Sequence, residues 1–588
     1  MNDNNDKNYD LSAGVRYDHK WGYQDTWFEF EDPETVTVAG NRYPVSGYTM
    51  PHLISFVEEI LGFPIKPEDR NTENRELELN KPVIDESFLT ELKEFFQSEQ
   101  ISTDSRARLI HSHGQLSIDE IYRILYGNFQ ERPVDLVIYP QTEEEIIRLT
   151  ELAGKHNVCL VPYGGGTNVS GALTCPAEES RMIVSVDMQH MNRIIWLDEE
   201  NNLACIEAGI TGKQLEIELN EKGYTTGHEP DSIELSTLGG WISTNASGMK
   251  KNRYGNIEDI VLEATLVTPT GKIETNSVTP RNSTSIQPRS FLFGSEGNFG
   301  IITKAVLKIY HVPEVREYGS LVFRTFEQGV RYLRELRRTG TLPASIRLVS
   351  NNEFRFGQAL KPAPSALKAV KDRIQRFYLF KILGFNLKNM VACTIVMEGS
   401  KADIAHQKKI IYGLAGKHSA LKAGSTNGKR GYMLTFAIAY IRDFFNKYYI
   451  LGETFETSVP WDRIHDVTSG VENELNEQCR RYNVPGNPYL SYRVTQTYHT
   501  GVCIYFTMGI YGKGLDKPDE IFHKIEFALR EVILAKGGSL SHHHGVGKIR
   551  QKFIPRIQTE NSTRVLQACK KAIDPKNIFA VRNGTFYE

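Results

Sequence analysis

The feature that most constrains the fold is a run of three glycines directly after a short apolar segment. Residues 162–168 read Pro-Tyr-Gly-Gly-Gly-Thr-Asn, and residues 158–161 before them are typical of a strand. Consecutive glycines reach backbone conformations that other residues avoid, and they bring N–H groups close to a bound anion. The spacing matches neither GxGxxG nor GxxxxGK[ST], so the fingerprints of the Rossmann and P-loop folds are missing. A pyrophosphate-binding loop and a plain glycine turn both remain open.

The residues around this loop alternate between strand and helix patterns. Strands are expected at 134–139, 158–161, 182–186, 204–208, 260–267 and 300–309. Thr142 and Glu145 form a capping box that predicts a helix, and a second helix is expected after Thr211. Further strands are expected at 390–397 and 501–509, amid longer helical patterns. The chain is therefore predicted to have an α+β fold.

Two more segments are rich in glycine, small residues and hydroxyls. The first runs from His228 to Gly248 and includes Leu-Gly-Gly at 238–240, and the second covers 294–303. Small residues allow close approach of a ligand, and hydroxyls offer hydrogen bonds without bulk. Each segment alone could be a loop. Three such segments in order are hard to explain as turns.

Together these segments resemble the PCMH-type FAD-binding domain of the vanillyl-alcohol oxidase superfamily. The resemblance covers about residues 130–312 and implies a two-subdomain FAD-binding domain with FAD as cofactor. Asn245 stands where an Arg is common, and Asn298-Phe299 replaces a common Thr-Leu. No covalent attachment motif is found in the first loop, so noncovalent FAD is expected. His228 is the nearest candidate for a covalent attachment. The implied cofactor-binding residues are Pro162, Tyr163, Gly164, Gly165, Gly166, Thr167, Asn168, His228, Asp231, Ser232, Thr237, Gly240, Thr244, Asn245, Ala246, Ser247, Glu296, Gly297, Asn298, Phe299, Gly300, Ile301 and Ile302.

A second unusual motif is the triple histidine His542-His543-His544, set between Ser541 and Gly545. Imidazoles titrate near neutral pH and can move protons. A solvated loop is one alternative, and a metal site is another. Adjacent side chains diverge and no fourth ligand has convincing spacing, so no metal is expected. The HxGDGNxH motif of related 2-hydroxyacid dehydrogenases is also missing, since residues 495–506 read TQTYHTGVCIYF.

Several longer segments narrow the resemblance further. They include WGYQDTWFEF, GMKKNRYGNIED, GETFETSVPWDR and SLSHHHGVGK. Along about residues 20–583 the chain is similar to the alkyldihydroxyacetonephosphate synthase family. This resemblance implies that a long-chain fatty alcohol replaces the acyl chain of acyl-dihydroxyacetone phosphate, with no net redox change of the flavin. The alternatives are an FAD-dependent 2-hydroxyacid oxidoreductase and a flavin-binding protein without activity.

The same resemblance assigns roles to individual residues. Tyr505 matches the acid/base, although by itself it reads as a strand aromatic facing the core. The implied catalytic set is Tyr505, His542, His543, His544 and Arg347, and the implied substrate-binding set is Arg442, Arg493 and Thr454. Arginine suits a phosphate dianion because its guanidinium can donate two parallel hydrogen bonds. Any single arginine could instead be a surface charge.

Composition limits the remaining partners. The formal net charge of −3 over 588 residues gives no basic excess, so nucleic-acid binding is not expected. Residues 431–449, GYMLTFAIAYIRDFFNKYY, are the most apolar stretch; they could line a tunnel for the alkyl chains or touch a membrane, and plain helix packing is the alternative. Peripheral membrane contact, a homodimer and a peroxisomal location follow from the resemblance, although no recognisable targeting signal is found.

Four segments are expected along the chain. Residues 1–110 are predicted to be an extension that wraps the body, with disorder over about the first eight. Residues 111–317 form the FAD-binding domain and 318–530 an α/β cap domain that binds substrate. Residues 531–588, with the histidine run and a terminal helix, are predicted to return to the FAD-binding domain.

Overall fold

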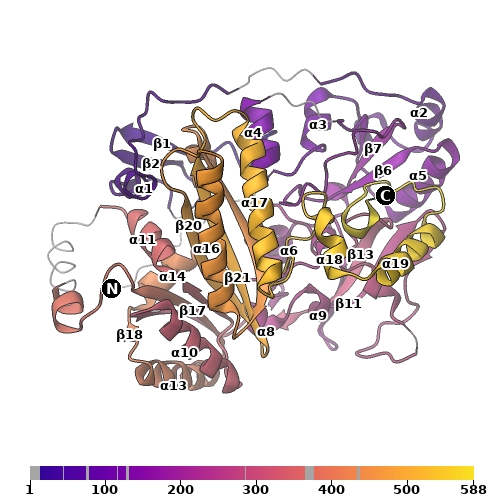
Figure 1. Ribbon diagram of the computed structural model, residues 1–588. Helices are drawn as coiled ribbons and strands as arrows, with labels where there is room; N and C mark the ends of the chain where they lie inside the picture. The colour runs from indigo at the N-terminus through magenta and orange to yellow at the C-terminus, as the bar shows by residue number, and fades with distance from the viewer. Residues whose placement is uncertain are drawn as a thin grey trace. The chain divides into compact units, whose positions relative to one another are not determined.

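The computed structural model describes residues 14–43, 45–73, 79–115, 117–127, 132–284, 286–363, 377–433 and 438–587. The expected disorder of the first eight residues lies outside this part of the chain. The chain divides into two compact units. The first comprises Met1–Glu73 and Glu314–Gly538, and the second comprises Asn74–Pro313 and Ser539–Glu588. Figure 1 labels their elements.

The second unit contains a four-stranded sheet in the order β4-β5-β7-β6. Strands β5, β6 and β7 are parallel, and β4 is antiparallel to β5. The helix predicted from the capping box is present: the Thr142 hydroxyl accepts a hydrogen bond from the Glu145 amide at 3.2 Å. The elements of this region are α2 Glu86–Leu92, β4 Ile101–Ser102, α3 Ser105–Ile110, α4 Ile118–Tyr126, β5 Leu136–Ile138, α5 Glu143–His156, β6 Cys159–Tyr163 and β7 Ile183–Asp187.

A five-stranded antiparallel sheet, in the order β12-β11-β13-β9-β8, follows in the same unit. The strands predicted at 204–208, 260–267 and 300–309 are β9, β11 and β13, each within two residues of the expected bounds. Thr211 caps the helix expected after it. The elements are β8 Ile194–Asp198, β9 Leu203–Glu207, α6 Gly212–Glu221, β10 Tyr224–Thr225, α7 Leu238–Thr244, α8 Lys251–Tyr254, α9 Ile257–Ile260, β11 Val261–Thr268, β12 Gly271–Ile273, β13 Ile301–Lys308 and β14 Tyr310–His311.

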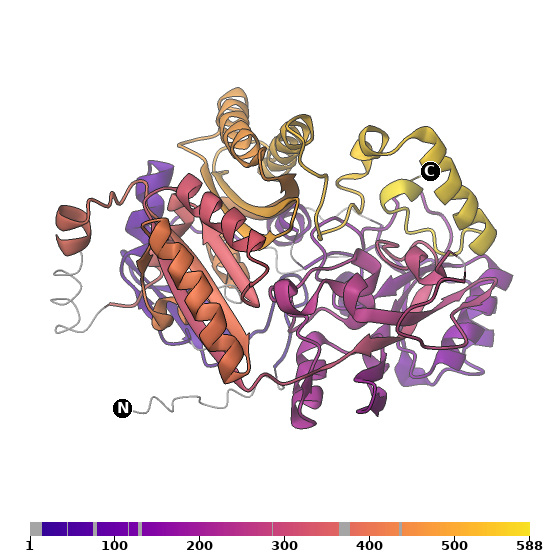
Figure 2. The same ribbon diagram turned by 90° about the horizontal axis from the view of Figure 1, so that it is seen from below.

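The C-terminal segment is built into this unit. In Figures 1 and 2 it is drawn in yellow against purple and magenta elements, with α18 (Ile554–Ile557) and α19 (Glu560–Ile573). Ile578 and Phe579 are fully buried in the core cluster that includes Leu136, Leu160 and Val184. Burial of each such side chain stabilises the unit by about 2 kcal/mol. The end of the chain is therefore part of the core of the parallel sheet.

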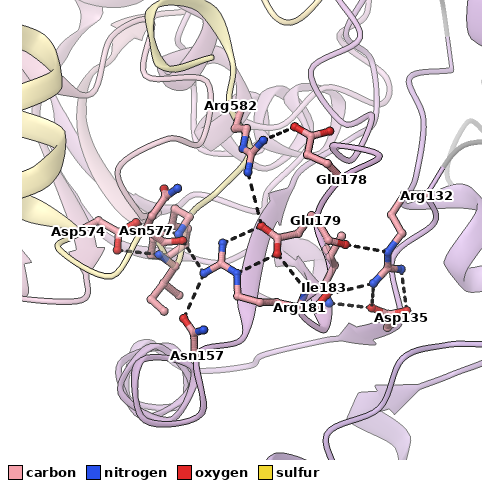
Figure 3. A network of polar contacts seen from close by, with 12 residues as sticks. Arg132, Asp135, Asn157, Glu178, Glu179, Arg181, Ile183, Asp574, Asn577 and Arg582 are labelled. Atoms are coloured by element: carbon pink, nitrogen blue, oxygen red, sulfur yellow. Dashed lines mark hydrogen bonds and ion pairs between the residues drawn. The ribbon is translucent and has the colours of Figure 1, made fainter. Parts of the chain in front are cut away.

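Polar contacts tie the same segment to the loop before β7 (Figure 3). The Arg181 guanidinium pairs with the Glu179 carboxylate at 2.7 Å and donates to the Asn577 carbonyl at 3.0 Å. Arg582 forms an ion pair with Glu178. The guanidinium of Arg181 lowers the pKa of Glu179 to about 2. These ion pairs hold the chain end beside the loop that follows the triple glycine.

The first unit is organised around a seven-stranded antiparallel sheet in the order β18-β15-β17-β16-β20-β21-β19. A smaller sheet of β1 Thr26–Asp32, β2 Thr35–Gly40 and β3 Thr49–Met50 precedes α1 Leu53–Leu61. The strands expected at 390–397 and 501–509 are β17 and β21. The remaining elements are β15 Val315–Phe323, α10 Phe326–Arg338, β16 Ser345–Val349, α11 Asn351–Ala359, β17 Val391–Gly399, α13 Lys401–Lys417, β18 Leu421–Lys422, α14 Ser425–Met433, α15 Ile438–Asn446, β19 Ile450–Pro460, α16 Ile464–Arg481, β20 Tyr489–Thr497, β21 Gly501–Tyr511 and α17 Pro518–Ala535.

The two faces of the large sheet differ in chemistry. Figure 1 shows α16 and α17 in front of β20 and β21. Phe455 and Phe506 are fully buried on the face that α17 covers, since Arg530 of this helix lies over the Phe455 ring. Because side chains alternate along a strand, Thr454 and Tyr505 point to the other face. The sheet thus has one apolar face for packing and one polar face.

The apolar stretch 431–449 is a pair of helices in its described part. Six of its aromatic and aliphatic side chains are buried: Tyr432, Tyr440, Ile441, Phe444, Phe445 and Tyr448. Phe444 contacts Phe28 and Phe30 of β1, and Tyr440 donates or accepts a hydrogen bond with Tyr43 at 3.2 Å. These six side chains are therefore used in helix packing, whereas a tunnel or a membrane contact formed by the rest of the stretch stays a prediction. Residues 434–437 lie outside the described part of the chain.

Candidate functional site

The triple-glycine loop lies against a second loop of the same unit. An added Cβ on Gly164 would overlap the Thr237 hydroxyl, and one on Gly165 would overlap the Leu235 carbonyl oxygen. Gly166 has φ of 69°, in the left-handed region that favours glycine. Only glycine therefore allows the backbone of residues 164–166 to reach residues 235–237. The structure brings the first two predicted cofactor loops together.

Thr237 begins the helix of the second loop. Its hydroxyl accepts from the Gly240 amide at 3.3 Å as the N-cap of α7. Asn245 ends this helix with φ of 54°. Asparagine tolerates this left-handed conformation better than arginine. The backbone conformation at the end of the helix therefore explains why Asn245 stands where an Arg is common.

His228, in the loop that precedes this helix, is 1% exposed. Its ring is 4.7 Å from the Trp241 ring. Neither ring nitrogen has a hydrogen-bond partner among the described residues. Burial lowers the pKa of His228 to about 3, and the charge of His543 acts in the same direction. The buried imidazole is thus neutral and has two ring nitrogens without a hydrogen-bond partner among the described residues.

In the third loop, two predicted side chains are engaged by the C-terminal segment. Asn298 is 2% exposed, and its amide group exchanges hydrogen bonds with the Asn583 backbone at 3.1 and 3.2 Å. The Phe299 ring packs edge-on against Phe586 at 5.0 Å. These two residues, which replace the common Thr-Leu, hold the end of the chain. Their side chains have a structural use that does not depend on a cofactor.

The glycine cradle, the hydroxyls and the unused imidazole fit a dinucleotide such as FAD. Backbone N–H groups of residues 164–168 would hold the pyrophosphate. Main-chain groups of 231–237, 244–247 and 296–302 would follow the rest of the molecule. The assignment of individual cofactor contacts stays a prediction.

The histidine run belongs to the same unit as these loops. His542 and His543 share a hydrogen bond between their Nδ1 atoms at 2.9 Å, and the rings of His543 and His544 are 4.5 Å apart. All three side chains are partly exposed. The amides of Lys548 and Ile549 donate to the Ser170 carbonyl at 2.9 and 3.2 Å. The run is therefore attached to the segment that directly follows the triple-glycine loop.

Four of the other predicted residues share the polar face of the large sheet in the first unit. Arg347, Arg493, Tyr505 and Thr454 lie on β16, β20, β21 and β19, which are consecutive in the sheet. Arg493 is directly opposite Tyr505, and Val349, two residues from Arg347, is opposite Arg493. Opposed residues and residues two apart point to the same face. The strand register thus brings these four side chains to one surface.

Tyr505 has two polar neighbours on this face. Its hydroxyl is 3.0 Å from the Thr454 hydroxyl. The Arg493 guanidinium lies 4.3 Å from the centre of the Tyr505 ring. The core-facing alternative for Tyr505 is therefore wrong, since the opposite side of β21 supplies the core residues.

Carboxylates orient two of the arginines. Glu353 of α11 pairs with Arg493 at 3.0 Å, and Asp443 accepts from Nε and Nη2 of Arg442 at 3.0 and 2.7 Å. Sequence reasoning missed both acids. Asp443 could have been found as the neighbour of Arg442, but Glu353 is 140 residues from Arg493 in the chain.

Comparisons with known proteins identify the family of the chain. The family described as FAD binding domain matches residues 134–277, and that described as FAD linked oxidases, C-terminal domain, matches 312–583. The chain is 39% identical over 566 residues to alkyldihydroxyacetonephosphate synthase of Caenorhabditis elegans, covering 96% of this chain and 94% of the relative. The chain belongs to the alkyldihydroxyacetonephosphate synthase family. It is 32% identical to the Dictyostelium discoideum synthase over 95% of this chain and 92% of the relative.

Solved structures extend this family assignment to the fold. A structure titled alkyldihydroxyacetonephosphate synthase superposes with a TM-score of 0.83 at 30% identity and covers 96% of this chain and 98% of that one. A p-cresol methylhydroxylase matches with a TM-score of 0.61 at 14% identity over 84% of this chain and 95% of that one, which shows the fold alone. As a member of the synthase family, the chain has the α+β fold of FAD-linked oxidases and FAD as its cofactor.

Stability should depend on pH through His228. The pKa in the folded chain is about 3, below the ordinary value of 6.5, so the unfolded chain takes up the proton first as pH falls. The free energy of unfolding should therefore decrease from pH 6.5 toward pH 3, by about 2 kcal/mol at pH 5. Urea unfolding of His228→Gln should lack this part of the pH dependence. Equal pH slopes for the variant and the wild type would contradict the assignment.

Proposed function

We propose that this protein is an alkylglycerone-phosphate synthase. It exchanges the acyl chain of acyl-dihydroxyacetone phosphate for a long-chain fatty alcohol and releases a fatty acid. The proposal is supported by the grouping of four predicted side chains on one sheet face, namely Arg347, Arg493, Tyr505 and Thr454. The chain's relatives in Caenorhabditis elegans and Dictyostelium discoideum are named alkyldihydroxyacetonephosphate synthase. Bound FAD, held noncovalently, would supply the reactive ring at which the exchange takes place, without net change of its redox state.

Tyr505 is the group that moves the proton of the substrate carbon C1. A free tyrosine has a pKa of about 10 and is a weak base at neutral pH. The Arg493 guanidinium over the ring and the Thr454 hydroxyl both stabilise the phenolate, which would bring proton transfer within reach. Thr454 can also return a hydrogen bond to the neutral phenol. The pair can therefore serve both directions of the transfer.

The remaining residues bind and orient. Arg442 and Arg493 supply guanidinium donors for the substrate phosphate, and Asp443 fixes the orientation of Arg442. Arg347 belongs to the proposed catalytic set. His542, His543 and His544 supply imidazoles for proton transfer to the leaving carboxylate and from the incoming alcohol. We further propose that the cap domain of residues 318–530 binds the substrate and that the enzyme is a peroxisomal homodimer, as the family resemblance suggests.

Exchange of Tyr505 tests the acid/base role. Tyr505→Phe keeps the ring under Arg493 and removes only the hydroxyl, so kcat for alkyl-ether formation should fall by about 10² to 10⁴. The assay is conversion of acyl-dihydroxyacetone phosphate and labelled hexadecanol, with bound FAD measured by absorbance. Tyr511→Phe, on the same strand, is the matched control and should retain activity. Full activity of Tyr505→Phe would refute the assignment.

We propose that residues 377–388, outside the apolar stretch 431–449, form a membrane contact. Phe377, Ile382 and Leu387 are 62%, 61% and 48% exposed around a short helical turn at Tyr378–Ile382. Lys381 and Lys388 are exposed beside them, and residues 377–390 contain no acidic side chain. Apolar side chains flanked by lysines fit an anionic lipid surface. No described helix is long and apolar enough to cross a bilayer.

Vesicle binding tests this contact. Ile382→Asp removes one apolar anchor and adds a negative charge, so binding to vesicles with anionic lipid should weaken by about tenfold. Ile286→Asp is the matched control, since Ile286 is 80% exposed in the other unit. Co-sedimentation measures both. Equal binding of the two variants would show that residues 377–387 do not face the membrane.

A further inference from the structure

One carboxylate connects two motifs that lie 250 residues apart in the chain. Glu296, in the third predicted cofactor loop, accepts hydrogen bonds from the amides of Val546 at 2.6 Å and Gly547 at 2.8 Å. These amides directly follow the triple histidine. Both parts belong to the same unit. Each oxygen of the carboxylate takes one amide, so the contact is a two-point attachment.

The backbone on both sides is shaped for this contact. Glu296 has φ of 45°, a left-handed conformation that non-glycine residues rarely adopt. Gly545 has φ of 80°, and an added Cβ there would overlap Oε1 of Glu296. Successive amides that converge on one anion form a nest. Here the anion is supplied by the protein's own side chain.

Other contacts complete the attachment of the histidine run. Arg550 donates to the carbonyls of Gly545 at 2.7 Å and Val169 at 3.2 Å. The side chain of Lys548 donates to Asn583 at 2.8 Å. Both cations lie near Glu296, but burial still raises the pKa of its carboxyl group.

We propose that the Glu296 side chain is a positioning residue that fixes the loop bearing His542, His543 and His544, while only its backbone serves the cofactor loop. This inference rests on the proposed function, in which these histidines transfer protons. The two hydrogen bonds from the Val546 and Gly547 amides to the Glu296 carboxylate fix the orientation of the histidine loop. The hydrogen bond between the Nδ1 atoms of His542 and His543 requires one of these atoms to carry a proton and the other to accept it.

Glu296→Gln tests the attachment with the shape of the side chain preserved. The amide can accept one N–H, but its NH₂ group opposes the second, so one bond is lost. In the holoenzyme, hydrogen exchange of the peptide that covers residues 542–549 should become about tenfold faster. The kcat for ether formation should fall at least about tenfold, with KM for both substrates and the affinity for FAD unchanged. Glu200→Gln, an exposed glutamate of the same unit, is the control and should behave as wild type.

The other side of the contact provides an independent test. Gly545→Ala places a methyl group against Glu296 and should reproduce the faster exchange and the lower kcat. Gly223→Ala controls for backbone strain, since Gly223 has φ of 83° and open space at its Cβ position. If both substitutions break the same contact, the double variant Glu296→Gln/Gly545→Ala should lose little more than the worse single variant.

Two results would overturn the proposal. Unchanged exchange of residues 542–549 in Glu296→Gln would show that the carboxylate does not hold the loop. Weaker FAD binding with normal loop protection would assign the side chain to the cofactor. A failure of the proposed function can be told apart from a failure of this inference. In the first case the wild type would form no ether, while hydrogen exchange of residues 542–549 would still show whether Glu296 holds the loop.

Discussion

The contact between residues 164–166 and 235–237 is the constraint on which the flavin-binding unit depends. Two backbone segments approach so closely that no Cβ fits at Gly164 or Gly165. One segment ends a strand of the parallel sheet, and the other begins α7 through the Thr237 cap. This contact therefore fixes how a helix start and a strand end meet. Any side chain at these glycines would separate the two loops.

The alternation of side chains along the strands organises the other unit in a similar way. Period-two alternation buries Phe455 and Phe506 on one side of the large sheet and places Thr454 and Tyr505 on the other. The register of four neighbouring strands then determines which polar side chains meet. A slip of one residue in β20 would move Arg493 to the apolar face and leave Tyr505 without its cation. Function thus depends on the same register that packs the core.

Local patterns predicted the elements of the fold well, because capping and strand periodicity act over a few residues. The Thr142 cap and the strands β6, β9, β13 and β21 are examples. Contacts between distant residues were not predictable in the same way. Nothing in the sequence links Glu353 to Arg493 or Glu296 to Gly547, because these pairs arise from topology. The stretch 431–449 shows the same limit, because its hydrophobicity indicates buried side chains but does not distinguish a protein core from a tunnel or a membrane contact.

The central claim is that the chain exchanges an acyl group for an alcohol without net electron transfer. The most direct test is a turnover without oxygen, with hexadecanol labelled with ¹⁸O and the products analysed by mass spectrometry. We predict that the label appears in the ether oxygen of the product, that a fatty acid is released, and that the visible absorbance of the flavin is the same before and after. An unlabelled product, or bleaching of the flavin by a 2-hydroxy acid with no ether formed, would contradict it.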